Sequence, residues 1–255
     1  MIAELIANQV HPERVLEAVA QRDMTAEVDR LIETLHVQHS GLNDTNTRRA
    51  AILDIVNPQT HNLTLHCTDF GNISLKAPQA PTSAELYSVP GHTILFAIHR
   101  QPFLVQLYRV TEDKLLMDER VTIYAGHPLW IDGRHFLFDV DTSSHSQQAF
   151  IGSINLPDRS ADISVYDRDT LRKIAWFPHD DGAARHLVSL QLLEGAEDPG
   201  GAKVAEELIY HYHPAVAWHA FQILYQQNRQ AALEYVPLLR QLKSQRLDYL
   251  LESLH

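Results

Sequence analysis

The sequence contains a single cysteine, Cys67, among 255 residues. One thiol excludes an internal disulfide bond and any zinc module that is built from several cysteines. There is also no run of about 18 apolar residues, the length that a membrane-spanning helix needs. The N-terminus lacks a cationic region followed by an apolar block, so the sequence predicts no signal peptide and a cytoplasmic location.

Basic residues are also few. The sequence has 21 Lys and Arg residues against 32 Asp and Glu residues, which gives a formal net charge of −11. Nucleic acids and anionic membranes are bound through basic surfaces, so this composition predicts neither of them as a partner. The sequence has no glycine-rich nucleotide loop, no Gly-x-Ser-x-Gly element and no His-Glu-x-x-His element. A protein that acts on a small-molecule substrate, or one that contacts other proteins, remains open.

The spacing of apolar residues changes twice along the chain. Residues 1–40 follow the helical i, i+3, i+4, i+7 pattern and are followed by a polar connector, and residues 183–255 return to the helical pattern. Between them, over residues 50–182, apolar and polar residues alternate, which indicates strands. The sequence therefore predicts an α+β fold with an N-terminal helical segment over 1–49, a central antiparallel β barrel or sandwich over 50–182, and C-terminal helices over 183–255 that pack on it.

The predicted strands are separated by turn residues, and no long amphipathic helix interrupts them, which favours antiparallel over parallel pairing. The pair Asp132–Gly133 is typical of a β-hairpin turn, and we expect His127 and His135 to face each other across it. The alternation predicts that one set of strand residues is mostly buried. This set comprises Phe103, Val105, Leu107, Phe136, Phe138 and Val140.

The stretch ERVTIYAGHPLWIDGRHFLFDV, residues 119–140, resembles the cupin pattern in which a glycine turn precedes a core strand. This resemblance implies a cupin-like double-stranded β-helix and a metal-dependent enzyme. The first metal motif of cupins has two histidines separated by one residue and then a glutamate. Here His92 and His99 are seven residues apart, so that motif is not intact.

The stretch HPAVAWHAFQILYQQNRQAALEYVPLLRQL, residues 213–242, is similar to one HEAT-type helix pair. Solenoids need about three such units to bury a continuous core, and only one is visible. The resemblance therefore implies a C-terminal helical hairpin, and we expect it to cover one side of the β core. Its Leu224, Leu233, Val236 and Leu239 should form the buried contact.

Sixteen histidines supply candidate metal ligands. His179 and Asp181 have the His-x-Asp spacing that begins the two-His-one-carboxylate triad of non-haem iron oxygenases. On an extended segment these two side chains would point to the same side. With a third ligand from His211 or His213, they predict a site for iron(II) or another divalent transition metal. The alternative is a plain turn, because Pro178, Asp180 and Gly182 are also turn formers.

Two other histidine groups compete with this site. The segment His211-Tyr212-His213 could chelate a metal together with His219, or His213 could simply cap the helix that Pro214 starts. A third group lies in the predicted strands and turns. It comprises His92, His99, His127 and His135, with Asp132, Asp139 and Asp141.

Two functions follow from these residues. The first is a metal-dependent enzyme of cupin-like fold, namely a mononuclear non-haem iron oxygenase that acts on a small molecule and can form a homodimer. The second is a non-enzymatic β-barrel sensor or scaffold that contacts other proteins through its C-terminal helices. Metal bound to the purified protein would favour the first function.

Overall fold

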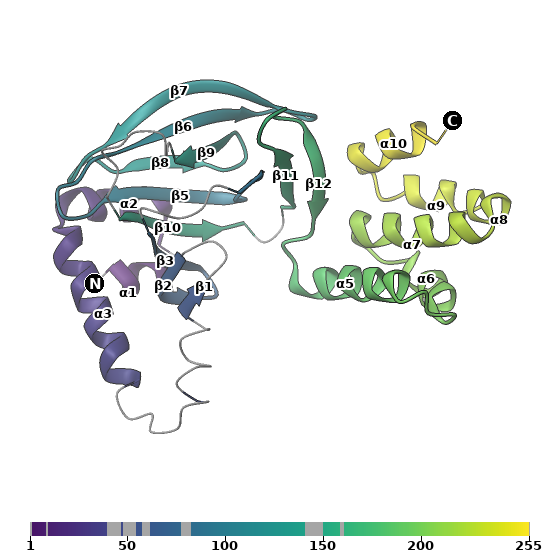
Figure 1. Ribbon diagram of the computed structural model, residues 1–255, viewed down its shortest axis with the longest axis horizontal. Helices are drawn as coiled ribbons and strands as arrows, with labels where there is room; N and C mark the ends of the chain where they lie inside the picture. The colour runs from purple at the N-terminus through teal and green to yellow at the C-terminus, as the bar shows by residue number, and fades with distance from the viewer. Residues whose placement is uncertain are drawn as a thin grey trace. The chain divides into compact units, whose positions relative to one another are not determined.

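The computed structural model describes residues 2–8, 10–39, 47, 55–57, 62–77, 83–140, 150–158 and 161–254. The chain divides into two compact units, which we call the β unit (Met1–Asp158 with Ser164–Ala175) and the helical unit (Arg159–Ile163 with Trp176–His255). Helices come first, antiparallel sheets follow and further helices end the chain (Figure 1), which confirms the predicted α+β class. The predicted 49/50 boundary and Asp141 lie outside the described residues.

Three helices open the β unit: α1 (Ile2–Ala7), α2 (Pro12–Gln21) and α3 (Met24–His39). Pro12 stands in the first turn of α2, where its missing N–H costs no helical hydrogen bond. The apolar faces of the three helices pack on one face of a sheet and form a buried core with it. This core includes Ile6, Val15, Val19, Val28 and Leu31 from the helices and Ile73, Ile94, Phe96 and Ile154 from the strands.

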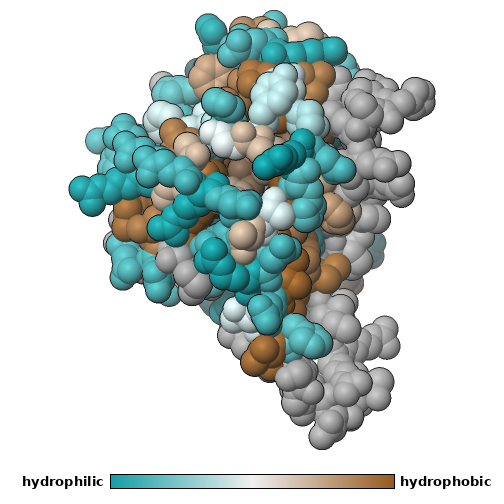
Figure 2. All heavy atoms as spheres, turned by 90° about the vertical axis from the view of Figure 1, so that its left-hand side faces the viewer, coloured by the Kyte–Doolittle hydropathy of each residue, from teal (hydrophilic) through white to brown (hydrophobic). Residues whose placement is uncertain are grey.

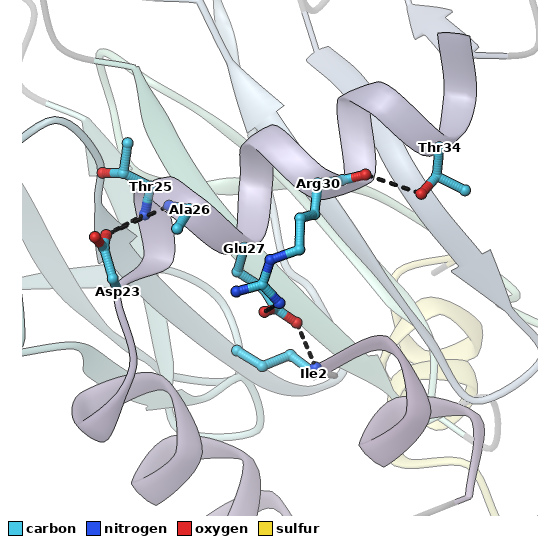
Figure 3. A network of polar contacts seen from close by, with 7 residues as sticks. All are labelled: Ile2, Asp23, Thr25, Ala26, Glu27, Arg30 and Thr34. Atoms are coloured by element: carbon cyan, nitrogen blue, oxygen red, sulfur yellow. Dashed lines mark hydrogen bonds and ion pairs between the residues drawn. The ribbon is translucent and has the colours of Figure 1, made fainter. Parts of the chain in front are cut away.

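A buried carboxylate ties α1 to α3 (Figure 3). Glu27 of α3 is only 2% exposed, and its Oε1 accepts a hydrogen bond of 2.7 Å from the backbone N–H of Ile2. Its Oε2 lies 2.9 Å from Nη1 of Arg30, one turn further along the helix. Because both oxygens have partners, the desolvation cost of burying this charge is offset.

Within the described part of the chain, the strands form three antiparallel sheets, with the orders β1-β2-β3-β10-β5-β8, β7-β6-β9 and β12-β11-β4. Their bounds are β1 Val56–Asn57, β2 Asn62–Thr68, β3 Gly71–Lys76, β4 Glu85–Tyr87, β5 Gly91–Ala97, β6 Phe103–Val110, β7 Leu115–Ile123, β8 Leu129–Asp132, β9 Phe136–Val140, β10 Ile151–Pro157, β11 Ile163–Asp167 and β12 Lys173–Phe177.

The pairing of these strands is nested. The pair β5–β8 lies between the two strands of the pair β3–β10 in chain order, and the pair β6–β7 lies between β5 and β8. β6 also pairs with β9 on its other edge. One buried cluster joins residues of β5, β8 and β10 to residues of β6, β7 and β9, so the first sheet packs face to face on the second. Two packed sheets with this nested antiparallel order are the arrangement of a jelly roll. The predicted antiparallel sandwich is therefore confirmed.

The predicted strand faces are largely correct. Phe103, Val105, Leu107 and Val140 are buried between the two sheets, and Phe136 and Phe138 are half-buried against them. Leu137 is also buried, but in a separate cluster with Tyr108 and Tyr166 on the opposite face of the second sheet. Because that sheet buries side chains on both faces, alternation alone left its inward face undecided.

The Asp132–Gly133 turn is not a hairpin turn, which corrects the sequence-based prediction. It joins β8, which pairs with β5, to β9, which pairs with β6, so the chain crosses here from one sheet to the other. His127 and His135 consequently do not face each other across a hairpin. The Asp-Gly pair did indicate the turn, because the backbone N–H of His135 bonds to the Asp132 carbonyl at 3.0 Å.

The helical unit contains α5 (Asp181–Gly195), α6 (Gly201–Leu208), α7 (Pro214–Gln227), α8 (Arg229–Leu233), α9 (Val236–Arg240) and α10 (Gln245–Glu252). These helices bury a core of their own, in which Leu190, Ala217, Phe221 and Leu239 are fully buried. The second helix of the predicted hairpin is divided into α8 and α9. Pro237, in the first turn of α9, explains the break, because proline lacks the N–H that a continuous helix would use.

Within the described ranges, no helix combines the length and the apolarity that crossing a bilayer requires. Figure 2 shows one face of the molecule, on which hydrophilic side chains predominate and hydrophobic groups form smaller patches among them.

Candidate functional site

His179 and Asp181 flank the start of α5. The described backbone at residues 179 and 180 is a bend, and Asp181 is the first residue of the helix, so the segment is not the extended strand that a His-x-Asp pair needs. The residue between them has clear partners. Asp180 caps α5 by accepting a 2.7 Å hydrogen bond from the Ala183 N–H, and its Oδ1 also accepts from the Tyr212 hydroxyl at 3.0 Å. Both bonds lower the pKa of Asp180.

His211 and His213 do come together, at the start of α7. The backbone N–H of His213 donates to Nδ1 of His211 at 3.0 Å. His213 itself caps α7, because its Nδ1 accepts from the Ala215 N–H at 3.2 Å. Its Nε2 lies 2.9 Å from Oδ1 of Asp162, and the accepting role of Nδ1 makes Nε2 the donor in this contact. Both ring nitrogens of His213 are thus occupied within the protein.

A third histidine, His186 of α5, completes what we call the histidine cluster (His186, His211 and His213). Its ring packs edge-on against His211 at a centroid distance of 5.2 Å, and the Tyr212 ring stacks on the same His211 ring at a centroid distance of 4.4 Å. Burial lowers the pKa of His211, the charges of His186 and His213 lower it further, and Asp180 acts in the opposite direction. Together these effects favour the neutral form of His211. Sequence reasoning missed His186, because only the packing of α5 brings it to residue 211.

The fit of these residues to a metal ion is limited. Among the residues that the structure describes, no group of three or more His, Cys, Asp or Glu side chains is arranged to hold a metal. His213 offers no free ring nitrogen, and Nδ1 of His211 already accepts a hydrogen bond. Nε2 of His219 lies 3.1 Å from Oε2 of Glu194, so this histidine contacts a different group from those of the histidine cluster. The site of His179, Asp181 and His211 or His213 stays a prediction.

The histidines of the third predicted group are dispersed over the β unit. His92 of β5 lies opposite Asp132 of β8, and its ring is 5.4 Å from that of Trp130. His99 lies in the turn after β5, while His127 and His135 lie in two other turns. Asp139 is engaged in an ion pair with Arg168. The structure does not bring the described members of this third predicted group together.

A polar row lies instead on the inner face of the jelly roll. Asn72, Asn155 and Thr93, on the adjacent strands β3, β10 and β5, form a chain in which Asn155 Nδ2 donates to Asn72 Oδ1 at 3.0 Å and Thr93 donates to Asn155 Oδ1 at 3.1 Å. Two residues further along β3 and β10, the hydroxyl groups of Ser74 and Ser153 form a hydrogen bond, with 2.9 Å between their Oγ atoms. In register and alternation these residues share the face of Leu95 and Ile151, which belong to the core between the sheets.

Lys76 ends this row. It pairs with Ile151 in the sheet and is half-buried. Burial is the main cause that lowers the pKa of Lys76, while Asp139 raises it and Arg168 lowers it. Arg168 is held in place by its ion pair with Asp139 and by a 2.6 Å hydrogen bond from its Nε to the Ser83 carbonyl. The sequence held a usable signal, because Asn72, Ser74 and Lys76 alternate with apolar residues.

No family model matches the chain, and no curated protein matches its sequence. Among solved structures, it resembles hydroquinone 1,2-dioxygenase PnpCD, crystallised in complex with Cd2+ and 4-hydroxybenzonitrile. That likeness has a TM-score of 0.30 at 6% sequence identity and covers 40% of this chain and 67% of the other.

Proposed function

We propose that this chain is a cupin-like protein whose β unit binds a small organic anion on the inner face of its jelly roll, with Lys76 as the residue that holds it. The observation that carries the proposal is the half-buried ammonium of Lys76 at the end of the polar row. A charge that has lost part of its hydration is stabilised by a bound opposite charge. Asp139 stabilises the Lys76 charge but also pairs with Arg168, so two cations share one carboxylate and a bound anion would balance the second positive charge.

The rest of the inner face suits such a ligand. Ser74 and Ser153, the residues of the row next to Lys76 and Ile151, carry hydroxyl groups on the same face, which can donate to a ligand oxygen. The same face becomes apolar at β5 and β8, where Leu95 and Ile131 are buried. A ligand with one carboxylate and a short apolar part matches this combination, because binding sites typically pair a few polar anchors with an apolar lining.

Replacing Lys76 with methionine tests the proposal. We expect Lys76→Met to abolish the rise in melting temperature that small carboxylates produce in the wild type, and to leave the free protein as stable or more stable, since a half-buried charge is removed. Thermal melting with and without a panel of short carboxylates measures both effects. Lys114→Met, at an exposed position of the same unit, should keep the ligand-induced shift. An undiminished shift in Lys76→Met would contradict the proposal.

The pH dependence of stability provides a second readout of the same variant. The pKa of Lys76 is lower in the folded state than its ordinary value of 10.5, so the unfolded chain binds more protons between the two values. The contribution of Lys76 to the free energy of unfolding therefore rises with pH across that alkaline window. We expect this rise to be absent in Lys76→Met when urea unfolding is measured at several pH values.

A metal-dependent enzyme, in the form of a mononuclear iron(II) oxygenase, is the second candidate. The histidine cluster favours it, because the neutral state of His211 is the one in which imidazole binds metals. If it is correct, protein purified without a histidine tag contains about one metal ion per chain, and His179→Ala loses that metal without unfolding. Elemental analysis measures this, with the exposed His127→Ala as a control. A folded protein without metal would favour the sensor or scaffold alternative.

A further inference from the structure

A cavity of about 540 Å³ opens in the β unit. Three chain segments line it: residues 22–25, which lead into the first turn of α3, residues 97, 99 and 100 at the end of β5 and in the turn after it, and residues 125–126 between β7 and β8. Its volume lies within the range of ordinary small-molecule sites, about 300–1,000 Å³. The lining is part apolar, from Met24, Ala97 and Ala125, and part strongly polar.

The charged groups of this cavity are mainly cationic. Arg22 and Arg100 line it from two different segments, and His99 stands beside Arg100. Neither guanidinium forms a hydrogen bond or an ion pair with a described residue, although the protein as a whole carries a net charge of −11. The carboxylate in the lining, Asp23, points back to the helix (Figure 3), where its Oδ1 accepts from the backbone N–H groups of Thr25 at 3.0 Å and Ala26 at 3.4 Å. One carboxylate outside the lining, Glu4 of α1, interacts electrostatically with Arg22, so Arg100 is the guanidinium of this cavity that has no acidic partner among the described residues.

The turn that presents these cations is strained. His99 and Arg100 have φ values of 53° and 56°, in the left-handed region that glycine and asparagine adopt most readily. The Gln101 N–H bonds to the Ile98 carbonyl at 3.1 Å and closes a two-residue turn, for which Asn-Gly is the favoured sequence. The Thr25 hydroxyl, itself in the cavity lining, accepts from the His99 N–H at 2.9 Å. Strain of this kind is typical of ligand-binding segments, where the side chain matters more than local stability.

From this arrangement we infer a second ligand site in this cavity, which binds a small phosphate monoester through Arg22, Arg100 and His99. Two guanidinium groups match the double charge and the oxygen geometry of a phosphate. The cavity is larger than a phosphate ion, and Met24, Ala97 and Ala125 provide an apolar wall for the organic part of the ester. The site shares no residue with the proposed Lys76 site, so the two can be tested separately.

Isothermal titration of the full chain with butyl phosphate and with inorganic phosphate, at matched ionic strength, tests the inference. We expect butyl phosphate to bind more tightly than inorganic phosphate, because only the ester contacts the apolar wall. Arg100→Asn and Arg22→Gln should each weaken butyl phosphate binding at least about tenfold, the scale of one lost charge-assisted contact. Arg14→Gln, at an exposed arginine of α2 outside the cavity, should leave the affinity unchanged.

Two further readouts separate loss of binding from loss of folding. Asparagine tolerates the left-handed region, so Arg100→Asn should melt no lower than the wild type. Arg100→Lys keeps the charge and should retain part of the affinity. The inference is overturned if neither phosphate compound binds, if Arg100→Asn and Arg22→Gln bind butyl phosphate as the wild type does, or if inorganic phosphate binds equally well, since the last result would indicate a site for a free ion.

Discussion

Replacing Gly133 with alanine should prevent the β unit from folding, or cost more than about 4 kcal/mol of stability, a loss that only severe backbone or packing conflicts produce. A Cβ on Gly133 would overlap the backbone carbonyl of Val89, well inside the 3.0 Å below which real Cβ atoms essentially never come. The neighbouring atoms are backbone, so they cannot rotate away. The Gly133 N–H also donates to the Gly91 carbonyl at 2.8 Å, which fixes the close approach.

Expression yield and circular dichroism of Gly133→Ala would measure this effect. Gly195→Ala is the matched control, because a Cβ there meets no atom within 4 Å. We expect the control to melt like the wild type or slightly higher, since alanine is the better helix former. A normally folded Gly133→Ala protein would show that the crossing between the sheets near β8 and β9 is wrongly placed.

Leu239→Ala should lower the stability of the helical unit by about 2–5 kcal/mol, the usual cost of emptying a packed core position. Leu239 of α9 is 0% exposed and belongs to the core that Phe221 and Leu224 of α7 also build. Thermal melting measures the loss, and hydrogen exchange of the α7 amides locates it. Because a typical domain is stable by only about 5–15 kcal/mol, the shift should be large.

Leu233→Ala is the matched control for this variant. Sequence reasoning placed Leu233 in the same buried contact, but it is 39% exposed, so its replacement should change the melting temperature little. The break between α8 and α9 explains the error, because the helical period does not continue across it. If Leu239→Ala melts like the wild type and elutes differently from a sizing column, this end of the chain is instead a docking surface for a partner or a second copy.

The candidate sites show how far sequence patterns reach. The interpretation of His213 as a helix cap needed only Pro214 beside it, and the structure confirms it. The spacing of His179 and Asp181 predicted a shared direction only if the segment were extended, and α5 begins at Asp181 instead. Lys76 went unnoticed, because a lysine in a strand looks exposed until its sheet neighbours and its pKa are known.

The sequence by itself determined the order of helices, strands and helices, the antiparallel class, and most of the buried faces, because these depend on the local period of apolar residues. Only the tertiary structure decided the contacts between distant segments. Asn72 and Asn155 are 83 residues apart and meet because β3 pairs with β10, and His186 meets His211 because two helices pack. The same holds for the cavity of Arg22 and Arg100, whose three lining segments come from separate elements. No local sequence pattern encodes such pairings. Many apolar strand and helix faces could pack on one another, and only the complete fold selects which of them do.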